Sequence, residues 1–252
     1  MALSGMKARG LVAFGLAIGL VVAACGSSSG TPNALSSTGN NGAGASGSSS
    51  LVSGLSSNLN SLTSYQFTES INGSSTGSAP TAAATGSLQI TGTVVNQPTK
   101  SMSLDAYGVQ YIVVGSQAWT SYDAGATWTA IDATDATLTD LLPSNNYGDW
   151  FDAYATDFTS QGNEMKNGVE CVHYKGNSSL GAIYQGITGV TASFDAELWV
   201  AVNGNYPVSG VYGFSASSGG QGGSFGYSFD ITHINGSSNK VTPPANVVAI
   251  PT

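Results

Sequence analysis

The sequence predicts a mainly β (α+β) domain, in which a strongly bent antiparallel sheet has short helices on its dry face. Several segments alternate apolar and polar residues with a period of two, which is typical of strands with one buried and one solvated face. Two other stretches repeat apolar residues at helical spacing, and such helices need an apolar surface to cover. The chain of 252 residues contains 34 Gly and only 8% charged residues, which excludes a coiled coil.

The N-terminal segment combines a short basic region, an apolar run and a cysteine. Lys7 and Arg9 precede an apolar run, residues 11–22, that is too short to span a bilayer. The run ends in small residues followed by Cys25. This pattern is typical of a bacterial lipoprotein signal (lipobox), and we therefore predict a lipoprotein signal peptide over residues 1–24. Its removal would leave Cys25 as an N-terminal residue with acyl chains (diacylglycerol, palmitate) on its sulfur and amine. The alternative is an ordinary cleaved signal with an incidental cysteine.

Residues 25–50 are predicted to form the acylated cysteine and a flexible linker. The linker consists almost wholly of Gly, Ser, Ala, Asn and Thr, and a coil of this kind spans roughly 25–30 Å. Without the signal the chain keeps four basic and 14 acidic residues, a net charge of -10. This charge disfavours nucleic acid and anionic lipid as partners. Attachment to the outer face of the plasma membrane would therefore depend on the acyl anchor.

Residues 51–252 are predicted to form one domain that opens with a helix and continues in strands. The helix is indicated by apolar residues at helical spacing, Leu51, Val52, Leu55, Leu59 and Leu62. Five segments then alternate, and only Glu69 interrupts the pattern. Their apolar members are Tyr65, Phe67 and Ile71; Leu88 and Ile90; Met102 and Leu104; Phe194, Ala196, Leu198 and Val200; and Phe225, Tyr227, Phe229 and Ile231. Two short helices broken at Pro143 are expected between these groups, from Leu138, Leu141 and Leu142 and from Trp150, Phe151, Tyr154 and Phe158.

The segment from Ser121 to Trp128 fits the pattern S-x-D-x-G-x-T-W, which is the Asp-box of sialidase-like propellers. Its chemistry is that of a hairpin turn, because Asp accepts backbone hydrogen bonds and Gly adopts positive φ. One copy in a domain of this length favours a structural turn over a propeller.

Other residues with reactive side chains do not combine into a catalytic or metal-binding pattern. His173 and His233 lie in strand-like stretches, away from the strand–turn–helix context of a nucleophile elbow. A loop with Asp132, Asp135 and Asp140 lacks the glycine and glutamate of a calcium-binding loop. Cys171 lies in an apolar strand and is expected to be buried and inert. We therefore expect no enzyme activity, no cofactor and no metal.

A set of strand and turn motifs runs through most of the predicted domain. They are Tyr65–Phe67, the Tyr111-to-Trp128 hairpins, Gly168–Tyr174, Ala196–Val200 followed by Tyr206–Val208, and Asn239–Pro244. Together these motifs resemble bacterial lipid-carrier lipoproteins of the LppX/LprG type, which share the half-barrel fold of the Lol lipoprotein carriers (LolA-like). The resemblance implies an open half-barrel whose hydrophobic cavity holds acyl chains, and a role in transport of lipid or lipoprotein.

We expect a monomer, and the resemblance implies that its partner is a membrane lipid or an acylated molecule. Candidate cavity residues are the apolar members of the strands, with an aromatic cover from the middle of the chain. They are Phe67, Leu88, Ile90, Leu104, Phe194, Leu198, Phe225 and Phe229, with Trp150, Phe151 and Tyr154 as the cover. The alternative is a non-enzymatic display or interaction module of the cell envelope, in which these residues form a solid core.

Overall fold

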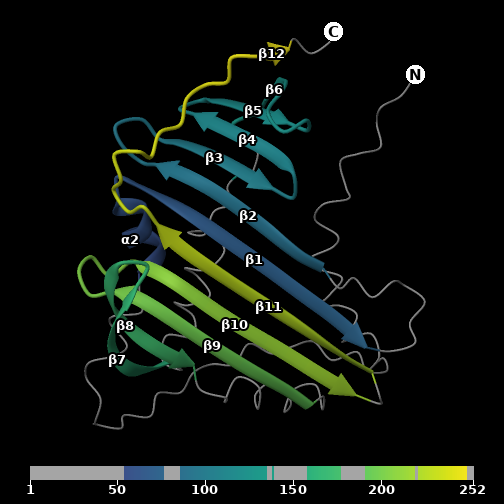
Figure 1. The fold of residues 1–252 in the computed structure, drawn as a ribbon, viewed down its shortest axis with the longest axis vertical. Helices are drawn as coiled ribbons and strands as arrows, with labels where there is room; N and C mark the ends of the chain where they lie inside the picture. Colours follow the sequence, from purple (N-terminus) through teal and green to yellow (C-terminus); the bar gives the residue numbers. More distant parts are fainter. Residues whose placement is uncertain are drawn as a thin grey trace, which may run out of the picture.

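The fold is one large sheet that includes strands from the whole length of the domain (Figure 1). The computed structural model describes residues 54–76, 86–134, 138, 158–176, 191–218 and 221–248. The strand order is β12-β6-β5-β4-β3-β2-β1-β11-β10-β9-β8-β7. The elements are α2 (Leu55–Ser61), β1 (Ser64–Thr76), β2 (Gly86–Val95), β3 (Ser101–Ala106), β4 (Val109–Val114), β5 (Gln117–Ser121), β6 (Trp128–Ile131), β7 (Phe158–Lys166), β8 (Val169–Gly176), β9 (Thr191–Ala201), β10 (Pro207–Ser218), β11 (Gln221–Thr232) and β12 (Val247–Val248).

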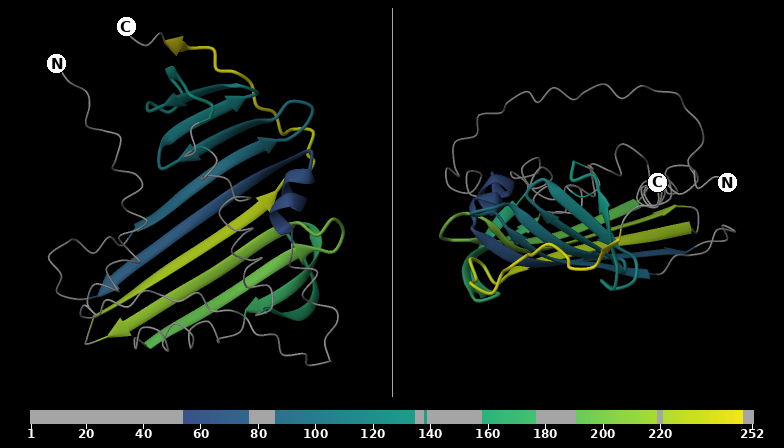
Figure 2. Two further views of the ribbon diagram at one scale, coloured as in Figure 1. Left: turned by 180° about the vertical axis from the view of Figure 1, so that it is seen from behind. Right: turned by 90° about the horizontal axis from the view of Figure 1, so that it is seen from above.

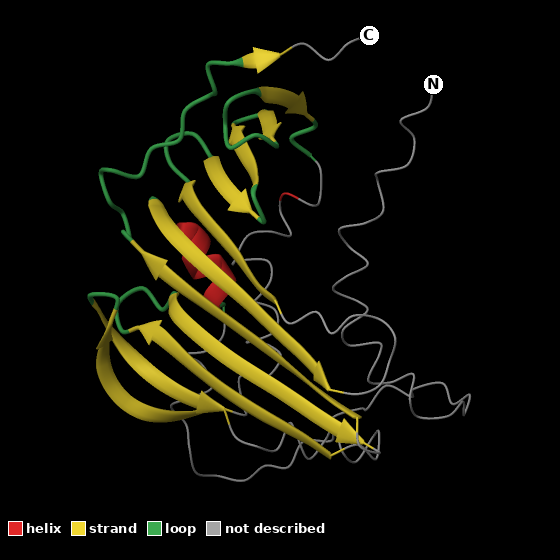
Figure 3. Ribbon diagram, turned by 45° about the vertical axis from the view of Figure 1, so that its right-hand side comes forward, coloured by secondary structure: helices red, strands yellow, loops and turns green. Residues whose placement is uncertain are grey.

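The sheet is curved and open, as the sequence predicts. Its strands pair antiparallel, except that β12 runs parallel to β6. The two edge strands, β12 and β7, lie at opposite ends of the strand order within the described chain. Figures 2 and 3 show that the sheet twists and bends without closing into a barrel. This architecture is an open half-barrel.

The centre of the sheet is β1, which pairs with β2 on one side and with β11 on the other. Phe67 lies opposite Gly92 of β2 and Ile231 of β11. The register puts the predicted apolar residues of β1, β2, β3, β9 and β11 on one face, which we call the dry face. Most of them belong to one buried cluster, together with Tyr174 of β8. The alternation read from the sequence is therefore confirmed.

The opening helix is confirmed and packs on the dry face. α2 covers Leu55–Ser61, and the buried Leu55 and Leu59 belong to the same cluster as the strand residues. The helix lies behind the sheet in Figure 1, beside the start of β1. Gly54 precedes it with φ 71, a left-handed conformation that glycine adopts without steric cost. Leu51 and Val52 lie outside the described residues.

The helices expected between residues 138 and 158 are only partly covered by the structure. Leu138 is helical and buried in the main cluster. Phe158 is not helical, and this part of the prediction is wrong. Phe158 begins β7 and pairs with Gly176 of β8. Its apolar side chain joins the buried cluster of the dry face at the edge of the sheet, and this contact favours the strand. The other residues of these helices lie outside the described chain.

Residues 233–248 run along the ends of the strands from β11 to β6 (Figure 1). The buried Asn239 fixes this segment, because its amide donates hydrogen bonds to the Ser64 hydroxyl (2.9 Å) and to the His233 carbonyl (2.6 Å). His233 lies just after β11 with φ 49, so it occupies a turn and not the strand that the sequence indicates. In the described part of the chain, no helix has the length and apolar character needed to cross a membrane.

Candidate functional site

The dry face carries a row of aromatic side chains across β9, β10 and β11. The rings of Phe194 and Tyr212 lie 6.4 Å apart, and those of Tyr212 and Phe225 lie 5.9 Å apart. Tyr212 also contacts Tyr227 at 5.2 Å, which continues to Phe229 at 6.3 Å. Phe194, Tyr212 and Phe225 are partly exposed, whereas Tyr227 and Phe229 are buried. The row therefore leads from a partly open end of the sheet into the core.

The predicted cavity residues that the structure describes all lie on the dry face, at different depths. Phe67, Ile90, Leu104, Leu198 and Phe229 are buried members of the main cluster. Phe194 and Phe225 pack against the cluster and keep part of their surface exposed. Leu88 lies opposite Ile71 on the same face and is 45% exposed. Trp150, Phe151, Tyr154 and Cys25 lie outside the described residues, so their predicted roles stay predictions.

Two glycines allow aromatic rings to lie low on the dry face. Gly92 lies opposite Phe67, and a Cβ at Gly92 would be 2.5 Å from the Phe67 ring. Gly210 lies opposite Phe229, and a Cβ there would be 2.4 Å from that ring. Real Cβ atoms do not approach rings so closely, so each ring occupies the space of the missing side chain. Rings in this position take up less height above the sheet than rings that stand upright.

Glu69 is a buried acid in the middle of this apolar face. It lies on β1 opposite Ile90 of β2 and Phe229 of β11, and its exposed fraction is 1%. Neither carboxyl oxygen makes a hydrogen bond within the described chain. The cavity prediction omitted this residue, although its interruption of the alternating pattern was the available signal.

Burial determines the protonation of Glu69. It raises the pKa of the carboxyl from 4.5 to about 8, because a charged carboxylate loses its hydration among apolar neighbours. The Tyr227 hydroxyl lowers this pKa by less than burial raises it, although the pair does not have the geometry of a full hydrogen bond. Glu69 is therefore mostly a neutral acid at pH 7.

The turn between β5 and β6 has the predicted Asp-box structure. Asp123 accepts hydrogen bonds from the Thr127 hydroxyl (2.6 Å) and the Thr127 backbone N–H (2.9 Å). These bonds, and one from the Ser121 hydroxyl (2.8 Å), lower the pKa of Asp123 to about 2. The Trp128 indole donates to the Gly125 carbonyl at 3.1 Å, and Gly125 has φ 85. The turn is structural and lies away from the aromatic row.

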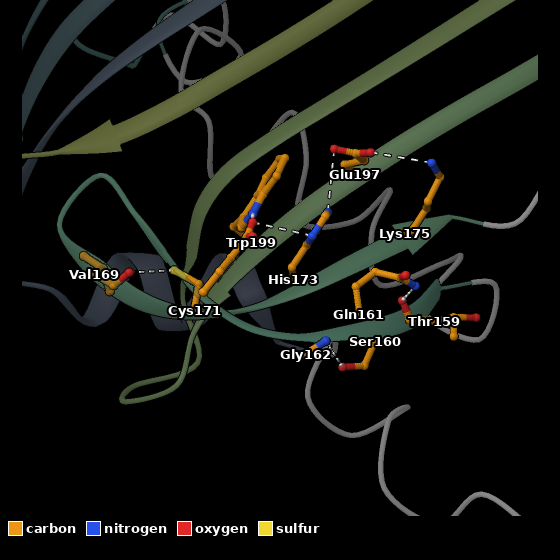
Figure 4. Close-up of polar contacts among 11 residues, drawn as sticks. Thr159, Ser160, Gln161, Gly162, Val169, Cys171, His173, Lys175, Glu197 and Trp199 are labelled. Atoms are coloured by element: carbon orange, nitrogen blue, oxygen red, sulfur yellow. Dashed lines mark hydrogen bonds and ion pairs between the residues drawn. The ribbon is translucent and has the colours of Figure 1, made fainter.

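A smaller buried cluster lies on the opposite face, where β8, β9 and β10 meet (Figure 4). Cys171 is buried there beside Trp199 and Val208, and burial raises the pKa of its thiol to about 11. The thiol is thus protonated and enclosed, as the sequence predicts. His173 stacks on Trp199 at 4.5 Å, and its ring nitrogens lie 3.5 Å from a Glu164 oxygen and 3.6 Å from a Glu197 oxygen.

Trp199 is enclosed by polar groups as well as apolar ones. Its indole donates a short hydrogen bond to Glu164, and the Lys166 ammonium lies 4.2 Å from the ring centroid. Glu197 also contacts Lys175 at 3.7 Å. These contacts hold the β7–β8 hairpin against β9. They give His173 a packing role on the solvated side of the sheet.

A polar hollow of about 360 Å³ also lies on the solvated face, over β1 to β4. Its walls include hydroxyl, amide and carboxyl side chains, among them Thr68, Thr91, Thr93, Ser103, Asp105 and Gln110. Such a surface suits water and not hydrocarbon, so this hollow is distinct from the apolar cavity that the resemblance implies. That cavity stays a prediction.

The described residues give little support for a metal site. Asp132 accepts hydrogen bonds from the Thr134 backbone N–H (2.9 Å) and hydroxyl (2.7 Å), which lower its pKa and close a local turn. Asp135 and Asp140 lie outside the described chain. Among the residues in the described ranges, His, Cys, Asp and Glu side chains form no group of three that could hold an ion.

Solved structures that are similar to this chain include two mycobacterial lipoproteins. LprF from Mycobacterium bovis is 12% identical, with a TM-score of 0.44, and the match covers 79% of this chain and 97% of LprF. LppX from Mycobacterium tuberculosis is 16% identical, with a TM-score of 0.34 and coverage of 73% and 92%. A third is a putative outer membrane lipoprotein-sorting protein domain from Vibrio parahaemolyticus, 8% identical, with a TM-score of 0.23 and coverage of 69% and 85%.

The sequence motifs resemble lipoproteins of the LppX type, and LppX is one of these matches. No family model matches the chain, and no curated protein does. At these identities the likeness concerns the fold alone.

Proposed function

We propose that this protein is a membrane-anchored extracytoplasmic lipoprotein that binds lipid acyl chains on the dry face of its sheet. It would serve transport of lipid or lipoprotein by binding and not by catalysis. The supporting observation is the aromatic row of β9, β10 and β11, which is partly exposed at one end and lies low over glycine at the other. An open, curved, apolar surface of this kind suits hydrocarbon chains.

The binding energy would come from removing apolar surface from water. Burial contributes about 25 cal/mol for each Å² of apolar surface, or about 0.8 kcal/mol for each methylene group of an acyl chain. Phe194, Phe225 and Leu88 retain exposed surface on the dry face. A bound acyl chain that covers these side chains would therefore remove its own apolar surface and theirs from water, and both contributions favour binding.

Attachment to the membrane is proposed to depend on Cys25. Two or three acyl chains hold a protein firmly at a bilayer, whereas one chain binds only marginally. A Cys25→Ser variant should lose the label when cells are fed a radioactive fatty acid, and it should leave the membrane fraction. Retained label on this variant would contradict the anchor.

Mass spectrometry of lipids extracted from the full chain tests the binding proposal. We expect stoichiometric lipid after purification from membranes, in addition to the acyl groups on Cys25. Phe194→Trp should lower this occupancy without unfolding, because Phe194 is only partly buried. Leu198 is less suited to the test, since it has no exposed surface and packs in the core.

Val211→Trp is the matched control. Val211 lies on β10, is 45% exposed, and faces the solvated side opposite Glu197. This variant should keep full lipid occupancy. Absence of lipid from the unmodified chain would contradict the proposal and favour the alternative of a display or interaction module.

A further inference from the structure

We infer that Glu69 forms a polar subsite in the middle of the dry face, where it donates a hydrogen bond to an ester carbonyl of the bound acyl lipid. This inference rests on the proposed function and adds the chemical class of the ligand. It follows from the position of one acidic side chain among apolar neighbours.

The position of Glu69 is central in the sheet. Its strand, β1, has β2 and β11 on its two sides, and its cross-strand neighbours are the buried Ile90 and Phe229. Two residues away on the same face lie Phe67 and Ile71, both buried. Any ligand that covers the aromatic row and reaches the core therefore passes close to this carboxyl group.

The carboxyl group has unmet hydrogen-bonding capacity. Both of its oxygens are buried and make no hydrogen bond within the described ranges. Leaving a buried polar group without a hydrogen bond destabilises the fold, whereas an apolar side chain would fill the same place without that cost. A ligand atom that accepts a hydrogen bond from Glu69 would remove the penalty, and this gives the acid a function.

A second donor lies on the same strand and the same face. Tyr65 is buried, four residues before Glu69, and its hydroxyl makes no hydrogen bond to another described residue. Burial and the nearby Glu69 raise the pKa of Tyr65 above its usual value, so the phenol keeps its proton. Glu69 and Tyr65 thus present two hydrogen-bond donors in an otherwise apolar surface.

The chemistry of these donors selects the ligand. A neutral carboxylic acid and a phenol can both donate to a carbonyl oxygen, which an ester of a fatty acid provides. A cationic head group would instead need an ionised carboxylate, and burial opposes that form. An ester-linked acyl lipid satisfies the donors and covers the surrounding hydrocarbon at once.

The protonation of the subsite depends on Glu69 alone near neutral pH. The titratable groups that interact with it are phenols, namely Tyr65 of β1, Tyr107 between β3 and β4, Tyr212 of β10 and Tyr227 of β11. Burial, with the charge of Glu69 as a second cause, raises the pKa of Tyr212 to about 12 and also raises that of Tyr107. Both therefore stay neutral where Glu69 titrates.

A pair of matched probes tests the inference on the full chain. Methyl dodecanoate carries one ester group, and pentadecane has the same number of non-hydrogen atoms without it. Each probe displaces the fluorescent hydrocarbon diphenylhexatriene from delipidated protein, in detergent below its micelle concentration. We expect the ester to bind about tenfold more tightly than pentadecane, which is the effect of one recovered hydrogen bond in an apolar site.

Substitutions at Glu69 distinguish the effect of its hydrogen bond from the effect of burying apolar surface. Glu69→Leu should lose most of the ester preference, since only the Tyr65 hydroxyl then remains as a donor, while Glu69→Gln should keep the preference because its amide still donates. Thr120→Val is the matched control, since Thr120 on β5 is also buried with a hydroxyl that makes no hydrogen bond to described residues. This variant should keep the full preference. Above about pH 8, the unmodified chain should lose most of the preference and Glu69→Gln should not.

The outcomes distinguish this inference from the function on which it rests. Equal binding of the two probes to the unmodified chain, or an undiminished ester preference in Glu69→Leu, would overturn the subsite and leave acyl-chain binding intact. Failure of both probes to bind the unmodified chain would overturn the proposed function itself. Near-ultraviolet circular dichroism of each variant shows that it is folded, and Glu69→Gln, which changes shape least, allows the pH comparison even if Glu69→Leu does not fold.

Discussion

The buried carboxyl of Glu69 should make the stability of the protein depend on pH, and Glu69→Gln should remove that dependence. In the unfolded chain the pKa of the group is near 4.5, and in the fold it is about 8. Between these values the unfolded state releases a proton that the folded state keeps. The unfolded state is therefore favoured as the pH rises, and stability falls from about pH 4.5 until the folded pKa is passed.

The size of the effect follows from the two pKa values. Each pKa unit corresponds to about 1.4 kcal/mol, so the full loss is of the order of 5 kcal/mol. Between about pH 5 and pH 8 the contribution of Glu69 should fall by about 3 to 4 kcal/mol. Glutamine has nearly the same shape and does not ionise, so the variant should lack this component.

Urea denaturation of the delipidated chain across this pH range measures the effect. The quantity to compare is the difference in unfolding free energy between the unmodified chain and Glu69→Gln at each pH, since titration of other groups cancels in it. Glu170→Gln is the control, because Glu170 is exposed at the start of β8. A difference that stays constant with pH would show that Glu69 is hydrated or paired in the folded protein, and would refute the reasoning.

Three further experiments test the packing. Gly210→Ala should lower the free energy of unfolding, measured by urea denaturation, by about 1–3 kcal/mol, because its Cβ would overlap the Phe229 ring. Gly213→Ala on the same strand has open space around its Cβ and should leave stability unchanged. Equal effects of the two substitutions would contradict the low position of the Phe229 ring. Ser121→Ala should lower the free energy of unfolding by about 1–2 kcal/mol, since the buried Ser121 hydroxyl accepts a hydrogen bond from the Gly125 N–H at 2.9 Å. An unchanged urea midpoint would argue against this account of the hairpin turn. Cys171, enclosed with a pKa of about 11, should react with a thiol reagent only after unfolding, and rapid reaction of the native protein would show that the small cluster opens.

The sheet could be predicted from the sequence because its two faces differ in chemistry. Phe225, Tyr227, Phe229 and Ile231 alternate with small polar residues, and each takes its expected place on the dry face of β11. Period-two alternation indicates which side of a strand is buried, and it therefore predicts which side chains share a face of the sheet. The Asp-box turn was equally predictable, since its hydrogen bonds are all local.

Depth within the dry face could not be predicted. Leu88 and Ile90 have the same pattern, yet Leu88 is exposed and Ile90 is buried, because Ile90 pairs with Glu69 near the centre and Leu88 lies toward the end of the strand. The apolar residues that recur before Phe158 predict a helix there, but pairing with β8 makes Phe158 the first residue of a strand. Both outcomes depend on contacts between segments that are distant in sequence.

The role of Glu69 also depends on such contacts. A single acid in an alternating segment can be a register error, a bulge or a buried group, and local sequence does not separate these. The register with β2 and β11 decides the matter by placing apolar neighbours on both sides. The low position of the Phe67 and Phe229 rings likewise cannot be predicted without the strand register, which places a glycine opposite each of them.

Photochemical crosslinking tests the central claim most directly. The full chain, purified from membranes, is irradiated with a fatty-acid methyl ester that carries a photoreactive group near the end of its chain, and the labelled peptides are identified by mass spectrometry. Acyl-chain binding on the dry face predicts labels on residues such as Phe194, Tyr212 and Phe225. Labels confined to the solvated face, at residues such as Thr91 and Ser103 in the polar hollow, or labelling that excess unlabelled ester does not suppress, would contradict it.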